Sequence, residues 1–382
     1  MQRTDIKLSE EGKRIADGIP LAEDHIVNLT DAILEICRET NLNIGGNIVA
    51  GLDVNGPIVA CDDSDLMPFK GAIEAIQYLM SQPGVQVTLM TGWDLTTMGF
   101  FRKDRLKLPI GIVGEYGMAY ELNGKTRHLY PYDENEAMTF VASVFEAVSH
   151  DNLKVAFQGN VSPGAGAIYI EGDKNGNLLN HCLVKGRRPS VLELYGGIKE
   201  ESEASLEGDK IVFNNVPENM KGFYNTLFRK HPLISVRVKK EEQNKLSIII
   251  DDTDKPDFTF ENLKAFGEKA KQLTGRDVLV YEDFGIDFMS PKVKSGNYSK
   301  DTGLREYARE AFGSSDFVSA IIGDKKSDIP VTRTNTLMFA IKNSDAVPIV
   351  EKMEDMPSLY PHDVRDFALA LSEAHRIAGQ KQ

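Results

Sequence analysis

Cysteine is scarce in this chain, which has three in 382 residues. Cys37, Cys61 and Cys182 lie far apart and match neither a disulfide framework nor the spacing of a zinc site. We therefore expect buried, reduced thiols at all three positions. Positive charge is also in short supply, since the formal net charge at pH 7 is −13. Nucleic acids and anionic membranes are themselves negative, so this charge balance argues against both as partners.

Long apolar runs are missing too. No stretch approaches the roughly 18 residues that a membrane span needs, and residues 1–5 lack the apolar core of a signal peptide. The sequence therefore predicts a cytoplasmic protein without a membrane segment. Hydrophobic residues make up 41% of the chain, and the length is sufficient for two domains that each have a core.

The most informative stretch is an apolar run that ends in polar residues. It spans residues 48–58 and reads IVAGLDVNGPI. Continuous β-branched and small residues suit a parallel strand that is buried on both faces, and Asn-Gly-Pro cannot continue such a strand. Ligands of open α/β sheets bind in the crevice at the carboxyl ends of the strands. The run therefore predicts a strand that carries Asp53 to an active-site loop.

Strand and helix patterns alternate around this run. The expected strands are 48–53, 85–90, 110–113, 317–322 and 337–341, and the expected helices are 68–82, 300–312 and 363–377. Right-handed crossovers place consecutive parallel strands side by side, which brings Thr91 near Asp53. The pattern predicts an α/β fold with a Rossmann-like parallel sheet.

The middle of the chain has a different pattern, with more strands than helices. Its strand candidates are 155–158, 167–171, 210–213, 234–239, 245–251 and 278–281, its helical patterns are 135–148, 218–230 and 261–273, and 186–207 reads as a long loop. Hairpin-like spacing predicts an α+β insert with a largely antiparallel sheet.

Three regions follow from these patterns. Residues 1–45 form a helical extension, with helical spacing from Leu21 to Asn41, that we expect to pack on the core or to form a subunit contact. We expect residues 46–118 and 286–382 to form the core domain and residues 119–285 to form the α+β insert.

Polar residues at the expected strand and helix ends suit a phosphate. Thr91 and Gly92 offer a hydroxyl and backbone N–H groups at a strand end. Lys300 lies in the first turn of a helix that Ser299 caps. The helix dipole disfavours a cation there, but this lysine would supply its charge to a bound anion. Lys292 and Lys294 are nearby competitors for that role.

Acidic residues occur in two places. Asp324 and Asp328 follow a buried strand in Gly-Asp-Lys-Lys-Ser-Asp, and two carboxylates at this spacing can converge on a hard cation. Asp62, Asp63 and Asp65 form an acidic loop that resembles a metal site, but a solvated flap is the simpler interpretation.

Taken together, these residues resemble the four motifs of the haloacid dehalogenase superfamily of aspartate-nucleophile phosphatases. The motifs are matched by Asp53-Val54-Asn55-Gly56-Pro57, Thr91-Gly92, Lys300, and Gly323-Asp324 to Asp328. Gly114-Glu115-Tyr116-Gly117 is similar to the turn after which some members insert a cap, as the Cof-type and sugar-phosphatase-like members do. The resemblance covers about residues 47–118 and 285–345. It implies that the insert at 119–285 is a cap, which matches the family in position rather than in residues.

The resemblance implies a magnesium-dependent phosphomonoester hydrolase. Asp53 would be the nucleophile and a metal ligand, the backbone carbonyl of Asn55, Asp324 and Asp328 would complete the metal site, and Thr91, Gly92 and Lys300 would hold the phosphoryl group. An aspartyl-phosphate intermediate splits one hard step into two easier ones, and Mg²⁺ supplies positioning and charge. The implied partner is a small phosphorylated metabolite, such as a sugar phosphate. Phosphomannomutase chemistry fits less well, because it relies on the second aspartate of the first motif.

Asn55 departs from the family at that aspartate, which is the general acid and base. An amide cannot exchange this proton, and loss of acid–base help typically slows a reaction roughly 10²–10⁴-fold. Asn55 is compatible with a substitution introduced to trap substrate, with a slow enzyme or an inactive phospholigand-binding regulator, or with a proton supplied by Asp62, Asp63 or Asp65. Pro57 in place of threonine and Trp93 after Thr-Gly are further departures.

Overall fold

The computed structural model describes residues 6–18, 23–131 without 62 and 64, and 298–380 without 354, together with strands and short stretches between 154 and 293. The chain divides into two compact units. The first comprises Met1–Leu129 and Gly296–Gln382, and the second comprises Tyr130–Ser295. The chain thus passes from one unit to the other after residues 129 and 295, later than the expected boundaries at 118 and 285. The first boundary shifts because the hairpin that follows residue 118 belongs to the sheet of the first unit, and the second shifts because the strand Gly285–Met289 pairs within the second unit.

An eight-stranded sheet forms the first unit, in the order β17-β16-β15-β1-β2-β3-β4-β5. Every pair from β17 to β3 is parallel, and the β4–β5 hairpin adds two antiparallel strands at one edge. The expected α/β fold with a mostly parallel sheet is confirmed. The strands are β1 (Ile48–Asp53), β2 (Val85–Met90), β3 (Gly111–Gly114), β4 (Ala119–Leu122), β5 (Lys125–His128), β15 (Val318–Gly323), β16 (Thr336–Ala340) and β17 (Ser358–Leu359).

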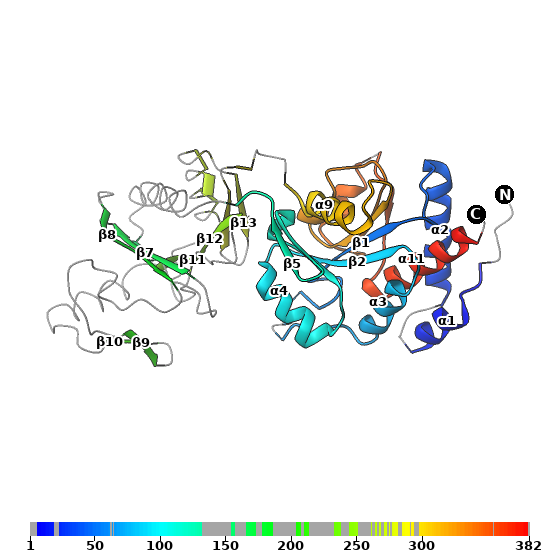
Figure 1. The fold of residues 1–382 in the computed structure, drawn as a ribbon, viewed down its shortest axis with the longest axis horizontal. Coiled ribbons are helices and arrows are strands. Elements are labelled where there is room, and N and C mark those ends of the chain that lie inside the picture. The colour runs from blue at the N-terminus through cyan, green and yellow to red at the C-terminus, as the bar shows by residue number, and fades with distance from the viewer. Residues whose placement is uncertain are drawn as a thin grey trace. The chain divides into compact units, whose positions relative to one another are not determined.

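Helices cover both faces of this sheet (Figure 1). Alternate residues of β1 enter different cores, because successive side chains of a strand point to opposite faces. Ile48 and Leu52 join one core cluster, whereas Val49 joins a second cluster with Leu304 and Tyr307. The helices are α1 (Glu10–Asp17), α2 (Glu23–Thr40), α3 (Ala72–Met80), α4 (Leu95–Phe101), α9 (Lys300–Phe312), α10 (Val347–Val350) and α11 (Val364–Gly379).

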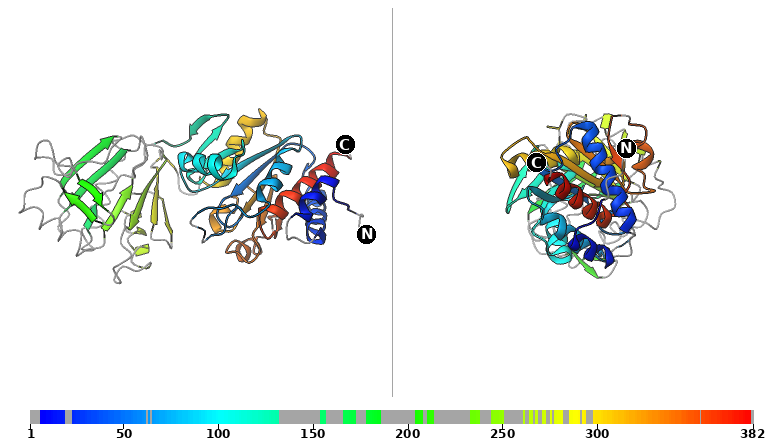
Figure 2. Two further views of the ribbon diagram at one scale, coloured as in Figure 1. Left: turned by 90° about the horizontal axis from the view of Figure 1, so that it is seen from below. Right: turned by 90° about the vertical axis from the view of Figure 1, so that its right-hand side faces the viewer.

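The N-terminal extension packs on the core, which was one of the two arrangements expected from the sequence. Helices α1 and α2 lie against α11 (Figure 2), and Ile26 and Ile33 of α2 are fully buried in the core that α11 shares. Among the described residues, none of the helices combines the length and the apolar character that crossing a membrane requires.

The second unit has a five-stranded sheet in the order β13-β14-β12-β11-β6, and the pairs β7–β8 and β9–β10. Among the described strands of this unit, every pair is antiparallel except β11–β6. The sheet is thus largely antiparallel, as the sequence predicts. The expectation of a long loop over 186–207 is wrong for residues 204–207, which form β9 and pair with β10. The helical patterns at 135–148 and 218–230 lie outside the described residues. The strands are β6 (Lys154–Ala156), β7 (Gly166–Gly172), β8 (Leu178–Lys185), β9 (Ala204–Glu207), β10 (Lys210–Phe213), β11 (Leu233–Arg237), β12 (Lys245–Ile250), β13 (Val278–Tyr281) and β14 (Gly285–Met289).

Candidate active site

Three strand ends of the first unit lie at one edge of the sheet. Asp53 is the last residue of β1 and pairs with Met90, so Thr91 follows directly on β2. On the other side of β1, Leu52 pairs with Ile322, which places Asp324 just beyond the end of β15. The parallel register therefore brings the polar residues that follow these strands to the same edge.

Lys300 reaches this edge from helix α9. Its Nζ lies 2.5 Å from Asp53 Oδ1 and 2.5 Å from Asp328 Oδ1, and all three residues are buried. The Ser299 hydroxyl accepts a hydrogen bond from the Thr302 amide at 3.1 Å, which caps the helix where the sequence predicts its start. Lys292 instead donates to the Pro131 carbonyl in the second unit, and Lys294 lies outside the described residues.

A close backbone approach fixes the start of α9. Gly117 has φ +86°, and a Cβ there would lie 1.9 Å from the Ser299 carbonyl oxygen. A Cβ on Gly303 would in turn lie 2.3 Å from the Gly117 carbonyl oxygen. Only glycines allow the turn after β3 to come this close to the helix. The Gly114–Gly117 turn therefore helps to position Lys300.

Asp328 organises the turn after β15. Its Oδ2 accepts hydrogen bonds from the backbone amides of Asp324 and Lys325, at 3.1 and 2.9 Å, while its Oδ1 faces Lys300. A Cβ on Gly323 would lie 2.2 Å from the Asp328 Cβ, so the turn is packed tightly. Asp328 thus links the turn that carries Asp324 to the ammonium that contacts Asp53.

The Asp324 carboxylate has one buried oxygen that accepts no hydrogen bond among the described residues. Its Oδ1 is buried without a hydrogen-bond partner among the described residues, and its Oδ2 accepts a hydrogen bond from Cys61 Sγ at 3.4 Å. Gly56 packs against this carboxylate, since a Cβ there would lie 2.7 Å from Asp324 Cγ. A buried acceptor with no donor is costly unless something else satisfies it. The position therefore suits a ligand that supplies positive charge.

Burial and like charge disturb ionisation at the site. Burial raises the pKa of Asp53 to about 7, and the negative charge of Asp328 raises it further, while Lys300 acts in the opposite direction. Burial also raises the pKa of Asp324, again with help from Asp328. For Lys300, burial disfavours the charged form, but Asp328 and Asp53 together raise the pKa of the ammonium. Three carboxylates surround one ammonium, so the site carries excess negative charge when all four groups are ionised.

These residues fit a hard divalent cation. One carboxylate oxygen from each of Asp53, Asp324 and Asp328 lies within 4.8 Å of the others. An oxygen-only donor set is what Mg²⁺ prefers, and two positive charges would offset the excess negative charge. The unpartnered Oδ1 of Asp324 is the observation that fits a metal most directly.

The loop after β1 is held by backbone bonds. Gly56 N donates to the Val59 carbonyl at 2.8 Å, and the amides of Ile58 and Val59 both donate to the Val54 carbonyl at 3.1 Å. Asn55 lies in this loop and is partly exposed. Asn55 thus lies two residues beyond the end of β1, next to Gly56, which packs against Asp324.

Thr91 and Gly92 directly follow β2, next to the end of β1. Thr91 is buried, and its hydroxyl oxygen accepts a hydrogen bond from Trp93 N at 3.0 Å, which leaves the hydroxyl hydrogen available as a donor. Gly92 lies against the Tyr116 ring, where a Cβ would come within 2.4 Å of Cζ.

In the acidic loop, the Asp63 carboxylate accepts hydrogen bonds from the backbone amides of Asp65 and Met67, which makes Asp63 a turn-stabilising residue. Asp62 lies outside the described residues.

Cys61 is the residue that sequence reasoning misplaced. Cys37 is buried as expected, but Cys61 is exposed and contacts Asp324. Loss of hydration, followed by the negative charge of Asp324, raises the pKa of this thiol to about 11. Nothing in the local pattern marks Cys61 as a neighbour of the site, because the contact depends on how the loop after β1 folds back. The side chain of Cys182 lies outside the described residues.

Comparisons with known proteins give structural matches only. No protein-family description and no curated protein matches the chain. A sugar phosphatase of haloacid dehalogenase subclass IIB matches with 14% identity and a TM-score of 0.43, over 87% of this chain and 99% of that one. A haloacid dehalogenase-like hydrolase from Bacteroides thetaiotaomicron matches with 11% identity and a TM-score of 0.46, over 87% and 99%.

A protein from Thermotoga maritima matches with 14% identity and a TM-score of 0.46, over 85% of this chain and 96% of that one. Members of the haloacid dehalogenase superfamily are thus among the solved structures that the chain matches.

Proposed function

We propose that this chain is a magnesium-dependent phosphomonoester hydrolase of the haloacid dehalogenase superfamily that acts through an aspartyl-phosphate. The observation that carries the proposal is the position of Lys300, whose Nζ lies 2.5 Å from both Asp53 and Asp328, beside a buried Asp324 oxygen that has no partner among the described residues. In a purely structural cluster, each buried carboxylate oxygen would accept a hydrogen bond. A buried oxygen that is left without a donor is instead what a metal ligand requires.

The chemistry starts at Asp53. Lys300 orients its carboxylate, one oxygen of which attacks phosphorus while the ester P–O bond breaks, and the leaving oxygen then needs a proton. Thr91 and the backbone of Gly92 hold the phosphoryl oxygens, and Lys300 offsets part of their charge. In the second step, water attacks phosphorus and the bond to Asp53 breaks. Mg²⁺, held by Asp53, Asp324, Asp328 and the Asn55 carbonyl, would supply charge neutralisation.

Asn55 limits this reaction. It occupies the position of the proton donor, and its amide cannot exchange a proton with the leaving oxygen or with water. We therefore propose slow turnover of a small phosphorylated metabolite, such as a sugar phosphate, with selectivity supplied by the cap. The second candidate is a regulatory protein that binds the same ligand without turnover, and Asn55 is the observation that favours it.

A phosphatase panel separates these functions. The native chain, Asn55→Asp and Asn55→Ala are compared on sugar phosphates with Mg²⁺, and Asp53→Asn serves as the inactive control. Turnover that rises roughly 10²–10⁴-fold in Asn55→Asp, but not in Asn55→Ala, supports the hydrolase.

Thermal shifts with Mg²⁺ and beryllium fluoride, a phosphoryl mimic, test binding in the same variants. A shift in the native chain that Asp53→Asn abolishes, without turnover in any variant, supports the regulator. If neither turnover nor a shift occurs, both functions are wrong.

A further inference from the structure

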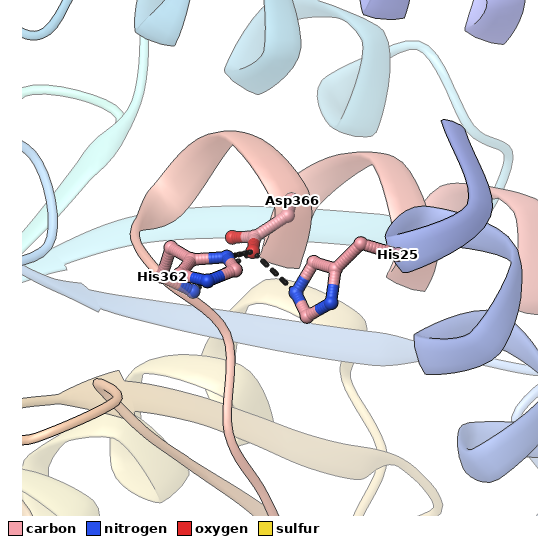
Figure 3. Close-up of side chains that lie close together, drawn as sticks. All are labelled: His25, His362 and Asp366. Carbon is pink, nitrogen blue, oxygen red and sulfur yellow. Dashed lines mark hydrogen bonds and ion pairs between the residues drawn. The ribbon is translucent and has the colours of Figure 1, made fainter. Parts of the chain in front are cut away.

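Two histidines and an aspartate, none of them part of the carboxylate site, lie close together in the first unit (Figure 3). His25 lies on α2, His362 precedes Asp363, the N-cap of α11, and Asp366 lies in the first turn of α11. His25 Nε2 is 3.0 Å and His362 Nδ1 is 3.1 Å from the same oxygen, Asp366 Oδ2. The two imidazole rings tilt toward each other, with centroids 4.4 Å apart. We call these three residues the His–His–Asp cluster.

The geometry is close to that of a three-ligand metal centre. The two nitrogens and the carboxylate oxygen all lie within 4.8 Å of one another. A tetrahedral ion with bonds of about 2.0–2.2 Å holds its ligand atoms roughly 3.3–3.6 Å apart. The observed nitrogen–oxygen distances of 3.0 and 3.1 Å therefore need to open by only a few tenths of an ångström.

The carboxylate is held in place by the backbone. Asp366 Oδ1 accepts the amides of Asp363 and Phe367, both at 3.1 Å, and Oδ2 accepts the amide of His362 at 2.8 Å. Such outer contacts orient a ligand before the metal arrives. Asp366 also compensates for the positive end of the α11 dipole, which would otherwise oppose a cation.

The chemistry of the donors selects the metal. Imidazole nitrogen suits Zn²⁺ and its neighbours in the first transition row, whereas Mg²⁺ prefers oxygen alone. The Asp366 side chain is fully buried, but the side chains of His25 and His362 retain 30% and 44% exposure. The ion would therefore be reachable from solvent and would keep a position for water.

We propose that His25, His362 and Asp366 form a binding site for a borderline divalent transition metal, of which Zn²⁺ is the leading case. The metal would tie α2, in the N-terminal extension, to the start of α11. The Val364 amide donates to the Pro57 carbonyl at 3.0 Å, so this end of α11 also touches the loop that follows Asp53. The site is separate from the carboxylate site and does not depend on hydrolase activity.

The test is a titration of the metal-free full-length chain with Zn²⁺ by calorimetry and thermal shift, repeated with Co²⁺ to detect the visible absorption of a tetrahedral centre. His25→Gln and His362→Gln each remove one ligand and leave the Asp366 contacts with the backbone. We expect each variant to bind Zn²⁺ more than about 10–100-fold more weakly, since loss of an outer-shell partner alone has that effect. Each shift is measured against the metal-free melting temperature of the same variant, which also shows that the variant is folded.

Three control variants locate the ion. His128→Gln removes a histidine elsewhere in the first unit, Asp324→Asn alters the carboxylate site, and Cys61→Ser removes the exposed thiol. All titrations contain excess Mg²⁺, so that binding at the carboxylate site does not contribute. The proposal requires that the Zn²⁺ binding which the histidine variants lose persists under these conditions in the native chain and in all three controls. It is overturned if the native chain does not bind Zn²⁺, if both histidine variants bind normally, or if Asp324→Asn or Cys61→Ser is the variant that loses binding.

Discussion

The Lys300 ammonium lies 2.5 Å from Asp53 Oδ1, and both side chains are almost completely buried. Lys300 also bonds Asp328, so a single cation offsets two carboxylates. Removing one partner of a buried ion pair leaves the other charge uncompensated, which typically destabilises a protein by about 3–5 kcal/mol. The relationship therefore makes Lys300 important for stability as well as for the proposed chemistry.

We expect Lys300→Met to lower the free energy of unfolding by about 3–5 kcal/mol in the absence of metal. Added Mg²⁺ should recover part of the loss, because the ion can take over the neutralising role. Phosphatase turnover should fall roughly 10²–10³-fold, as it does when one charge-stabilising donor is removed from an active site. Urea unfolding with and without Mg²⁺ and a turnover assay measure these effects.

Lys326→Met is the matched control, because Lys326 is exposed in the turn next to the site. It should change stability by less than about 0.5 kcal/mol. Equal effects of the two substitutions would show that Lys300 does not neutralise the carboxylates.

The second prediction concerns pH. Burial raises the pKa of Asp53 from its ordinary 3.8 to about 7 in the folded chain. Between these values the folded chain binds a proton that the unfolded chain has released, so this group lowers stability as pH rises from about 4 to about 7. The slope is at most about 1.4 kcal/mol per pH unit. Other carboxylates titrate as well, so the difference between the native chain and Asp53→Asn isolates the contribution.

Unfolding of the metal-free protein at pH 5, 6, 7 and 8 should thus show a native-minus-variant difference that falls with pH and levels off near 7. Mg²⁺ should bind with release of protons below that pH, because it needs the ionised carboxylate. Calorimetry in buffers of different ionisation enthalpy counts these protons. A difference that rises with pH would mean that Asp53 is stabilised as the anion.

The third prediction uses two glycines with similar backbone angles. Gly117 and Gly124 have φ +86° and +73°, but a Cβ would meet Ser299 at 1.9 Å in the first case and nothing within 4 Å in the second. Gly124→Ala should therefore lose only the about 1–2 kcal/mol of left-handed strain. Gly117→Ala adds overpacking, a further 1–3 kcal/mol or so.

Because the clash falls on the residue that precedes Lys300, Gly117→Ala should also reduce turnover, whereas Gly124→Ala should not. Thermal unfolding and turnover of the two variants test this. Similar losses of stability without a difference in turnover would show that the contact between Gly117 and Ser299 does not position the lysine.

Local signals in the sequence account for much of the carboxylate site. The apolar run that ends at Asp53 predicts the buried strand, and parallel pairing then brings Thr91 and Asp324 to the same edge. The cap residue Ser299 marks the start of α9, so that Lys300 is placed correctly. These features depend on residue periodicity and on helix capping, which a short window of sequence contains.

Features that depend on distant packing are not visible in this way. His25 and Asp366 are 341 positions apart, and they meet only because α2 packs on α11. The exposure of Cys61 depends on the path of the loop after β1, and the β4–β5 hairpin is too short and too polar to show a clear alternation. Such contacts follow from tertiary structure and have no local pattern.

The last prediction concerns the attachment of the N-terminal helix. Glu373 of α11 is completely buried and accepts hydrogen bonds from Ser9 Oγ at 2.5 Å, Ser9 N at 3.2 Å and Tyr78 OH at 2.8 Å, while Arg376 pairs with its other oxygen. Ser9 is also the N-cap of α1. Glu373 therefore anchors the start of α1 to the core through several charge-assisted bonds.

Glu373→Gln replaces one acceptor oxygen by an amide that cannot satisfy both the donors of Ser9 and Tyr78 and the Arg376 guanidinium. Hydrogen bonds to charged groups contribute about 1.5–3 kcal/mol each, so we expect a loss of at least 2 kcal/mol or so. The α1 amides should exchange with solvent faster, while Mg²⁺ binding at the carboxylate site stays unchanged. Glu11→Gln, on the exposed face of α1, is the matched control and should be nearly neutral. If hydrogen exchange in α1 is the same in both variants, helix α1 is held by its apolar contacts, and the buried carboxylate is not its anchor.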